Sequence, residues 1–179
     1  MSLNEESQQL VNRLIDELRV AIPQTYETLC EEFPDLCGFA IGTTSIVEFV
    51  VPIFQTRSEL PNDDTEANNE QRFWPPEWEV MNQGERNDSF GEHVDNAATN
   101  LNAHCAATNY EFGGDIADAY LNSLLALLVD LESAGKLGEK NDERYLTIWL
   151  AGDDEEWIFK SSEQLNSSAL HQRVLQMYG

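Results

Sequence analysis

The sequence predicts a single α+β domain over residues 1–179, with a mainly antiparallel sheet packed against about four to five helices. Amphipathic segments with helical spacing and apolar segments rich in β-branched residues occur in groups and do not alternate regularly. Two of the apolar segments have turn residues in their middle, which is typical of hairpins. The hydrophobic content of 41% is normal for a globular chain, and this length can bury a sizeable core.

The first element is expected to be a helix over residues 3–33. Its apolar residues recur at three- and four-residue spacing: Leu10, Val11, Leu14, Ile15, Leu18 and Ile22. Ser2 and Glu5 resemble a capping box at its start. Pro23 is expected to kink this helix or to divide it in two, because proline lacks a backbone donor and clashes with the preceding turn.

Residues 38–56, GFAIGTTSIVEFVVPIFQT, predict the first hairpin, with Gly42 to Ser45 at its turn. The second strand is nearly all apolar, which indicates burial on both faces. Pro52 in that strand favours a bulge or an edge position, because it cannot donate to a neighbouring strand. Residues 56–71 have no apolar period and are expected to form a polar loop.

The segment RFWPPEWEV is predicted to be a Trp-rich strand, because paired prolines favour an extended backbone. Residues four apart in a strand lie on one side, so Trp74 and Trp78 are expected to project together, with Glu77 opposite. The preferred interpretation is that both indoles cover the core, since aromatic side chains mostly supply buried area. The alternative is an aromatic platform for a ligand.

The second half of the chain predicts two helices, a hairpin and a last helix. The helices are expected over 89–110 and from Asp115 to about Gly135, the second with a leucine-rich middle that should lie across the sheet. RYLTIWLAG and EWIFK are predicted to be the two strands of a second hairpin, around an acidic turn. The last helix is expected over residues 167–178.

Charge is the strongest global signal in the sequence. The 33 acidic and 10 basic residues give a formal net charge of −23. Such a surface repels phosphate backbones and anionic lipids, so direct binding to nucleic acid or membranes is disfavoured, whereas a basic protein would be attracted. The alternative is that the acidity serves solubility or adaptation to salt, which net charge explains equally well.

The densest acidic run marks the candidate partner-binding residues: Asp153, Asp154, Glu155 and Glu156, followed by Trp157 as a candidate anchor. Asp63 and Asp64 in the expected polar loop form a second candidate patch. Charge runs of this kind are often solvated turns, but they also serve as interaction features.

Motifs for catalysis, metals and cofactors are missing from the sequence. It has no nucleotide-binding glycine motif, no zinc-protease motif and no nucleophile elbow. Its three cysteines and three histidines lack the spacing of a metal site. We therefore expect no catalytic residues, no metal and no cofactor. The N-terminal residues do not resemble a signal peptide, and no apolar run reaches the roughly 20 residues of a membrane span, so a cytoplasmic location is expected.

Several features together resemble a known bacterial family, domain of unknown function 4303. They are the N-terminal helix followed by a hairpin, FWPPEWEV with its W-x-x-x-W spacing, the late strand pair and the segment FKSSEQLN. The resemblance covers nearly the whole chain and implies no catalytic residues. It implies, by association, that small acidic domains of this sort are often encoded beside polymorphic toxins as cytoplasmic immunity proteins.

The leading hypothesis is a non-enzymatic, acidic protein-binding domain that acts as an immunity protein or inhibitor by occluding a basic toxin. One alternative is a DNA mimic, whose carboxylates imitate phosphate spacing to occupy a nucleic-acid-binding protein. Another is an enzyme that acts on a cationic or sugar substrate through carboxylates converging in a pocket. The sequence indicates no particular oligomeric state.

Overall fold

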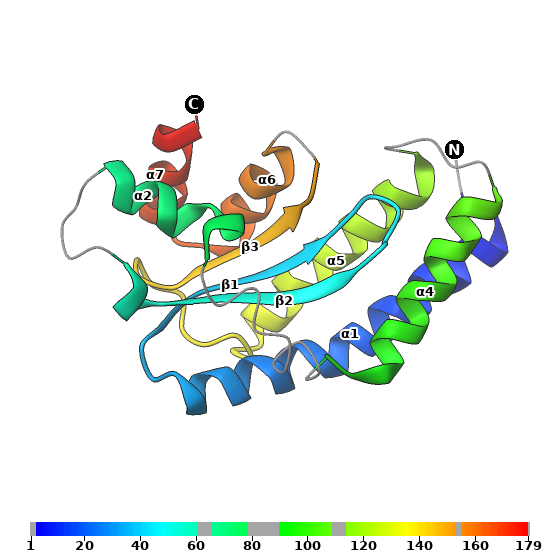
Figure 1. The fold of residues 1–179 in the computed structure, drawn as a ribbon, viewed down its shortest axis with the longest axis horizontal. Coiled ribbons are helices and arrows are strands. Elements are labelled where there is room, and N and C mark those ends of the chain that lie inside the picture. Colours follow the sequence, from blue (N-terminus) through cyan, green and yellow to red (C-terminus); the bar gives the residue numbers. More distant parts are fainter. Residues whose placement is uncertain (1–2, 61–65, 79–89, 109–113, 153–154, 179) are drawn as a thin grey trace.

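A computed structural model describes residues 3–60, 66–78, 90–108, 114–152 and 155–178 of the chain. Its sheet has three strands in the order β2-β1-β3. Strands β1 (Leu36–Thr43) and β2 (Val50–Thr56) pair antiparallel as the predicted first hairpin, and β3 (Tyr145–Leu150) pairs parallel to β1 (Figure 1). Pro52 lies in the edge strand β2, as predicted, where a missing donor is tolerated.

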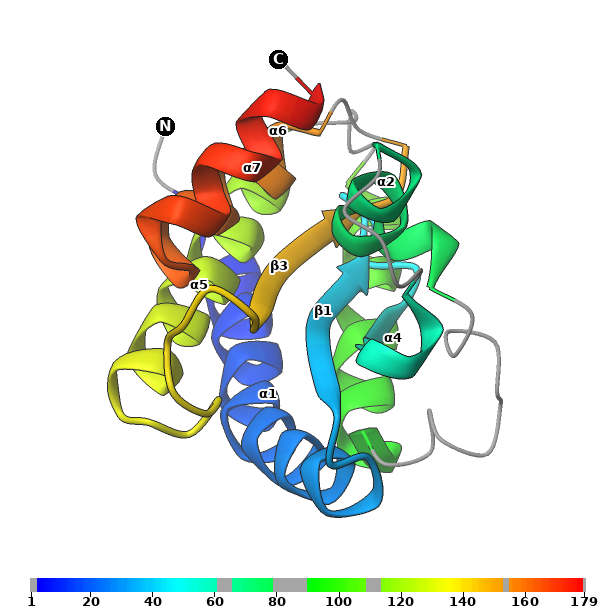
Figure 2. The ribbon, with the colours of Figure 1, turned by 90° about the vertical axis from the view of Figure 1, so that its left-hand side faces the viewer.

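Helices cover both faces of this sheet. The long helices α1 (Glu5–Glu32), α4 (Gly91–Ala107) and α5 (Asp115–Ser133) lie on one face, and the shorter α2 (Glu66–Phe73) and α7 (Ser168–Tyr178) lie on the other (Figures 1 and 2). Helix α6 (Glu156–Leu165) packs beside β3. The α+β class is therefore confirmed, and α4, α5 and α7 fall within the helices expected over 89–110, from Asp115 and over 167–178.

Two apolar clusters result from the alternation of side chains along the strands. Phe39 and Ile41 of β1 belong to the larger cluster with α1, α4 and α5. Ala40, between them in sequence, belongs to the smaller cluster with residues of α2, α6 and α7. The smaller cluster matters most for function, because it supports the candidate functional site.

Helix α1 is continuous over 28 residues with Pro23 inside it, so the expected division into two helices is wrong. The buried face continues across the proline through Ile22, Tyr26 and Leu29. This packing outweighs the cost of about 3 kcal/mol of an interior proline. The N-terminal cap is Asn4, whose side chain accepts a hydrogen bond of 2.8 Å from the Ser7 N–H; Ser2 of the expected capping box lies outside the described residues.

The expected second hairpin is also wrong, and with it the mainly antiparallel sheet. RYLTIWLAG does form strand β3, but this strand joins β1 in parallel. EWIFK is the first part of α6, because Trp157, Ile158, Ser161 and Leu165 continue a buried helical stripe beyond the five residues. A short apolar window cannot distinguish a strand from such a helix.

The predicted Trp-rich strand and polar loop are replaced in part by helical structure. Residues 66–73 form α2, and Pro75–Glu77 form a 3₁₀ turn, η2, with Trp74 extended between them. The paired prolines occupy the first two positions of that turn, where a missing donor is harmless. Because this turn interrupts the extended backbone, the two tryptophans are not on one side of a strand as expected. Trp78 is fully buried, whereas Trp74 is only partly buried.

Candidate functional site

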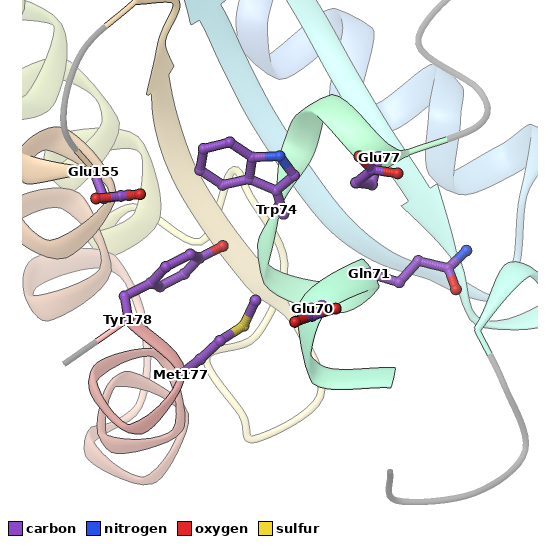
Figure 3. Close-up of a pocket in the computed structure, with 7 residues that line it drawn as sticks. All are labelled: Glu70, Gln71, Trp74, Glu77, Glu155, Met177 and Tyr178. Carbon is purple, nitrogen blue, oxygen red and sulfur yellow. The ribbon is translucent and has the colours of Figure 1, made fainter. Parts of the chain in front are cut away.

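A pocket of about 750 Å³ opens above the smaller apolar cluster. It lies where α2, η2, the start of α6 and the end of α7 meet (Figure 3). Its lining combines two aromatic residues, a methionine, a glutamine and three glutamates: Trp74, Tyr178, Met177, Gln71, Glu70, Glu77 and Glu155. This size is typical of ligand sites, which range over roughly 300–1,000 Å³.

Aromatic rings build the apolar wall of the pocket. The Trp74 and Tyr178 ring centroids lie 5.8 Å apart with planes inclined at 47°. Phe159 of α6 contacts the other side of Tyr178 edge-on, also at a centroid distance of 5.8 Å. Tyr178 is thereby held between two elements, and such pairs prefer these tilted and edge-on arrangements. The wall is therefore fixed by packing on both sides.

Two other aromatic residues of the same segment, Phe73 and Trp78, belong to the smaller apolar cluster against which Trp74 packs. Both are fully buried, and each packs near edge-on against Tyr145 of β3. The Trp78 indole N–H donates a 2.9 Å hydrogen bond to the carbonyl of Gln71, in the last turn of α2, where carbonyls lack partners within the helix. Trp78 is thus part of the core, and of the two tryptophans only Trp74 lines the pocket.

Three carboxylates surround this aromatic wall, from three separate segments. Glu70 belongs to α2, Glu77 to η2, and Glu155 precedes α6. Figure 3 shows Glu155 on one side of Trp74 and Tyr178 and Glu70 on the other. No ion pair joins any of the three to a basic side chain among the described residues. The pocket therefore carries a concentrated negative potential beside an apolar surface.

Two buried hydroxyl groups lie in this region: that of Tyr178, near Glu155 and Glu70, and that of Tyr145, near Tyr178. Within the described chain, neither Tyr178 nor Tyr145 makes a hydrogen bond of ordinary geometry through its hydroxyl. Burial raises the pKa of the Tyr178 hydroxyl above its usual value, and the nearby Tyr145, Glu155 and Glu70 raise it further. Burial also raises the pKa of Tyr145, although the Thr147 side chain acts in the opposite direction. Both hydroxyls therefore stay protonated, and that of Tyr178 lies close to two of the carboxylates.

One residue of the acidic run predicted from the sequence, Glu155, belongs to this pocket. Glu155 lines it, whereas Glu156 is exposed in the first turn of α6. Asp153 and Asp154 lie outside the described residues. Trp157 is 7% exposed and packs into the larger cluster with the Lys160 ammonium 4.1 Å from its ring, so it is not placed as a surface anchor.

The second predicted patch, Asp63 and Asp64, also lies outside the described residues. Sequence reasoning missed Glu70, Met177 and Tyr178 as pocket residues. Their signal was weak, because Glu70 falls in the segment interpreted as a loop and Tyr178 ends a helix of ordinary amphipathic pattern. Tertiary structure alone brings these segments together.

One other arrangement resembles catalytic geometry. The Ser7 hydroxyl lies 2.8 Å from His104 Nε2, and His104 Nδ1 lies 4.0 Å from a Glu6 carboxylate oxygen. Ser7 is only 2% exposed, so a substrate cannot reach its hydroxyl. Its role is to join the start of α1 to the end of α4.

Comparisons with known proteins identify the family of the chain. The model of a family described as "Domain of unknown function (DUF4303)" matches residues 18–167. No curated protein and no solved structure shows significant similarity to the chain. Over the described residues, none of the helices combines the length and apolar character that a membrane crossing requires.

Proposed function

The chain belongs to the DUF4303 family, and we propose that it is a non-enzymatic, acidic domain that binds a basic protein and occludes it. An immunity protein that blocks a basic toxin in the cytoplasm is the form of this function that we favour. The observation that carries the proposal is the pocket, in which Glu70, Glu77 and Glu155 surround an aromatic wall.

Charge supports the proposal in two ways. A net charge of −23 attracts a basic partner over long distances and raises the rate of encounter. At short range, the three glutamates are available to positive groups, since none forms an ion pair with the described basic residues. Trp74 and Tyr178 add the kind of aromatic surface that often dominates binding energy in protein interfaces.

The acidic run at residues 153–156 fits this proposal as an extension of the pocket. Glu155 connects the two features, because it belongs to the run and also lines the pocket. The partner-binding surface that we propose therefore comprises the run, the pocket glutamates and Trp74. Asp63 and Asp64 stay candidates for a second patch.

The proposal is tested by affinity capture from a lysate of the source organism at about 50 mM and about 300 mM salt, a range over which the Debye length falls by a factor of about two. We expect a basic protein to be retained in stoichiometric amount, and we expect the higher salt concentration to weaken its binding. A variant with Asp153, Asp154, Glu155 and Glu156 changed to lysine should lose it. Retention of only acidic or neutral proteins, or of none, would contradict the proposal.

The matched control changes four acids of other segments to lysine: Asp16, Glu31, Glu48 and Glu139. All four are exposed, and the control has the same net charge as the first variant. It should keep most of the binding, because its pocket is intact. Equal loss in both variants would show that only total charge matters, and the assignment of the binding surface would be wrong.

An enzyme is the second candidate, because the pocket brings carboxylates from three segments into one concave site. Paired carboxylates of this kind can serve as general acid and base. The two functions differ in their response to Glu70→Gln and Glu155→Gln, which would abolish turnover of a substrate but leave much of a large protein interface intact. The DNA-mimic hypothesis stays a prediction, and it requires that DNA compete for the partner.

A further inference from the structure

We infer that the pocket binds an organic cation that carries N–H donors at the end of an alkyl chain, which is the chemistry of a lysine or arginine side chain. The inference rests on the proposed function, because it names the group of the basic partner that enters the protein. A free polyamine shares this chemistry and is the other source of such a group.

The walls of the pocket account for the alkyl chain and the positive charge. Trp74, Tyr178 and Met177 present apolar surface along which a hydrocarbon stem can pack. The aromatic faces also attract a cation directly, with an energy of about 0.5–2 kcal/mol. Glu70 and Glu155, on either side of this wall, accept hydrogen bonds from a charged donor (Figure 3). A neutral or anionic ligand would leave these carboxylates uncompensated.

The hydroxyl groups account for the N–H donors. The Tyr178 oxygen is fully buried, lies near Glu155, Glu70 and Tyr145, and has no partner among the described residues. Tyr145 is 0% exposed, and its hydroxyl makes no hydrogen bond of ordinary geometry there, although the Thr147 side chain is near enough to lower its pKa. A buried polar group without a partner costs about 1–3 kcal/mol. A ligand whose entry displaces the Tyr178 ring slightly can donate to this oxygen and to a carboxylate, and it then removes part of this cost.

The spacing of the carboxylates favours an organic cation over a metal ion. Among the described residues, no three acidic, histidine or cysteine side chains are placed to hold one metal ion. Glu70, Glu77 and Glu155 line the same pocket without converging on a single point. An ammonium or guanidinium group has several donors directed outward, so it can bridge acceptors that are spread over a pocket. The pocket volume of about 750 Å³ also leaves room for the flanking residues of a peptide.

The test follows the indole N–H signals of the full chain by two-dimensional NMR. The Trp74 signal is assigned from its loss in Trp74→Phe. The probes are capped Gly-Arg-Gly and Gly-Lys-Gly peptides, capped Gly-Leu-Gly as a baseline, spermidine, and tetramethylammonium, a cation without donors. We expect the Arg and Lys peptides to shift the Trp74 signal saturably. The signals of Trp149 and Trp157, which lie outside the 750 Å³ pocket, should stay in place.

Variants connect this binding to the residues named above. The double variant Glu70→Gln with Glu155→Gln should bind the Arg peptide about tenfold more weakly, because two charged hydrogen-bond acceptors are lost. The control pair Glu31→Gln and Glu139→Gln has the same net charge and should bind like the native chain. Tyr178→Phe removes only the hydroxyl and should weaken binding about fivefold.

The outcomes separate the inference from the proposed function. No shift of the Trp74 signal with any cation, equal weakening by both glutamine pairs, or equally tight binding of tetramethylammonium would overturn the inference. Spermidine binding without peptide binding would keep the cation site but count against a protein partner. If affinity capture yields a basic protein that the pocket variants retain as well as the control does, the proposed function stands and the inference fails.

Discussion

At the scale of single residues, the contact between Gly38 and Trp78 is a tight constraint in the smaller apolar cluster. A Cβ atom at Gly38 would lie 2.9 Å from the Trp78 ring and 3.2 Å from Gln55 Cβ. Trp78 cannot move away easily, because its N–H is bound to the Gln71 carbonyl and its ring packs on Tyr145. Glycine is therefore required at residue 38 by close approach.

We predict that Gly38→Ala lowers the free energy of unfolding by about 1–3 kcal/mol, as overpacking of a core does. Urea denaturation of the purified chain measures this change. The control is a double-mutant cycle with Trp78→Phe, whose smaller ring should make the added methyl group less costly. An equal loss from Gly38→Ala in both backgrounds would show that the ring contact is not the cause.

Single residues also show where sequence reasoning reaches its limit for the site. Glu155 was predicted from the acidic run, and Trp74 from the unusual Trp-Pro-Pro segment. The sequence could not distinguish Trp74 from Trp78, because both are the same residue type around one pair of prolines. The distinction depends on the Trp78 N–H reaching the Gln71 carbonyl, a contact made by the local turn.

At the scale of elements, side chains of α6 and of its C-terminal cap residue, Asn166, protect the free edge of β3. The Asn166 amide accepts from the Leu146 N–H at 2.8 Å and donates to the Leu146 carbonyl at 2.7 Å, as a neighbouring strand would. The Ser161 hydroxyl accepts from the Ile148 N–H at 3.0 Å. An edge without such cover is a template for pairing with other chains.

We predict that Asn166→Leu lowers the free energy of unfolding by about 2–4 kcal/mol, because two buried backbone groups of Leu146 lose their partner. The measurement is urea denaturation, with light scattering to detect association through the exposed edge. Asn100→Leu, at an exposed position of α4, is the control and should change stability little. A variant at Asn166 as stable and monomeric as the control would contradict this role of the amide.

Elements also explain which parts of the fold the sequence predicts. Long amphipathic segments such as α1 and α5 were identified, since their apolar period extends over many residues. EWIFK was misread, because five residues do not reveal the stripe that continues to Leu165. The parallel pairing of β3 was missed because strand order depends on contacts between distant segments, although its run of buried residues is typical of a strand covered on both faces.

At the scale of the whole molecule, the excess of acidic residues has an energetic cost. The formal net charge is −23, and only a few ion pairs join the described residues. Like charges held close together in the folded state repel one another more than in the expanded chain. Salt screens this repulsion and should therefore favour the folded state.

We predict that the midpoint of thermal unfolding rises by several degrees between about 10 mM and about 300 mM sodium chloride, as the Debye length falls from about 30 Å to below 10 Å. Calorimetry measures the midpoint. The control variant with four lysines carries less negative charge and should show a smaller rise. An unchanged or falling midpoint in the native chain would contradict a dominant role for repulsion.

The parallel pairing of β1 with β3 has a consequence for the order in which the molecule forms. Gly38 pairs with Tyr145, so more than a hundred residues separate the partners of the central strand. During synthesis, the hairpin of β1 and β2 leaves the ribosome long before β3. One edge of β1 therefore stays unpaired until β3 has been made. Long-range pairing of this kind slows folding. Tyr145 of β3 belongs to the apolar cluster against which Trp74 and Tyr178 of the pocket pack, so the site that we propose for the partner is among the last parts of the nascent chain to be completed.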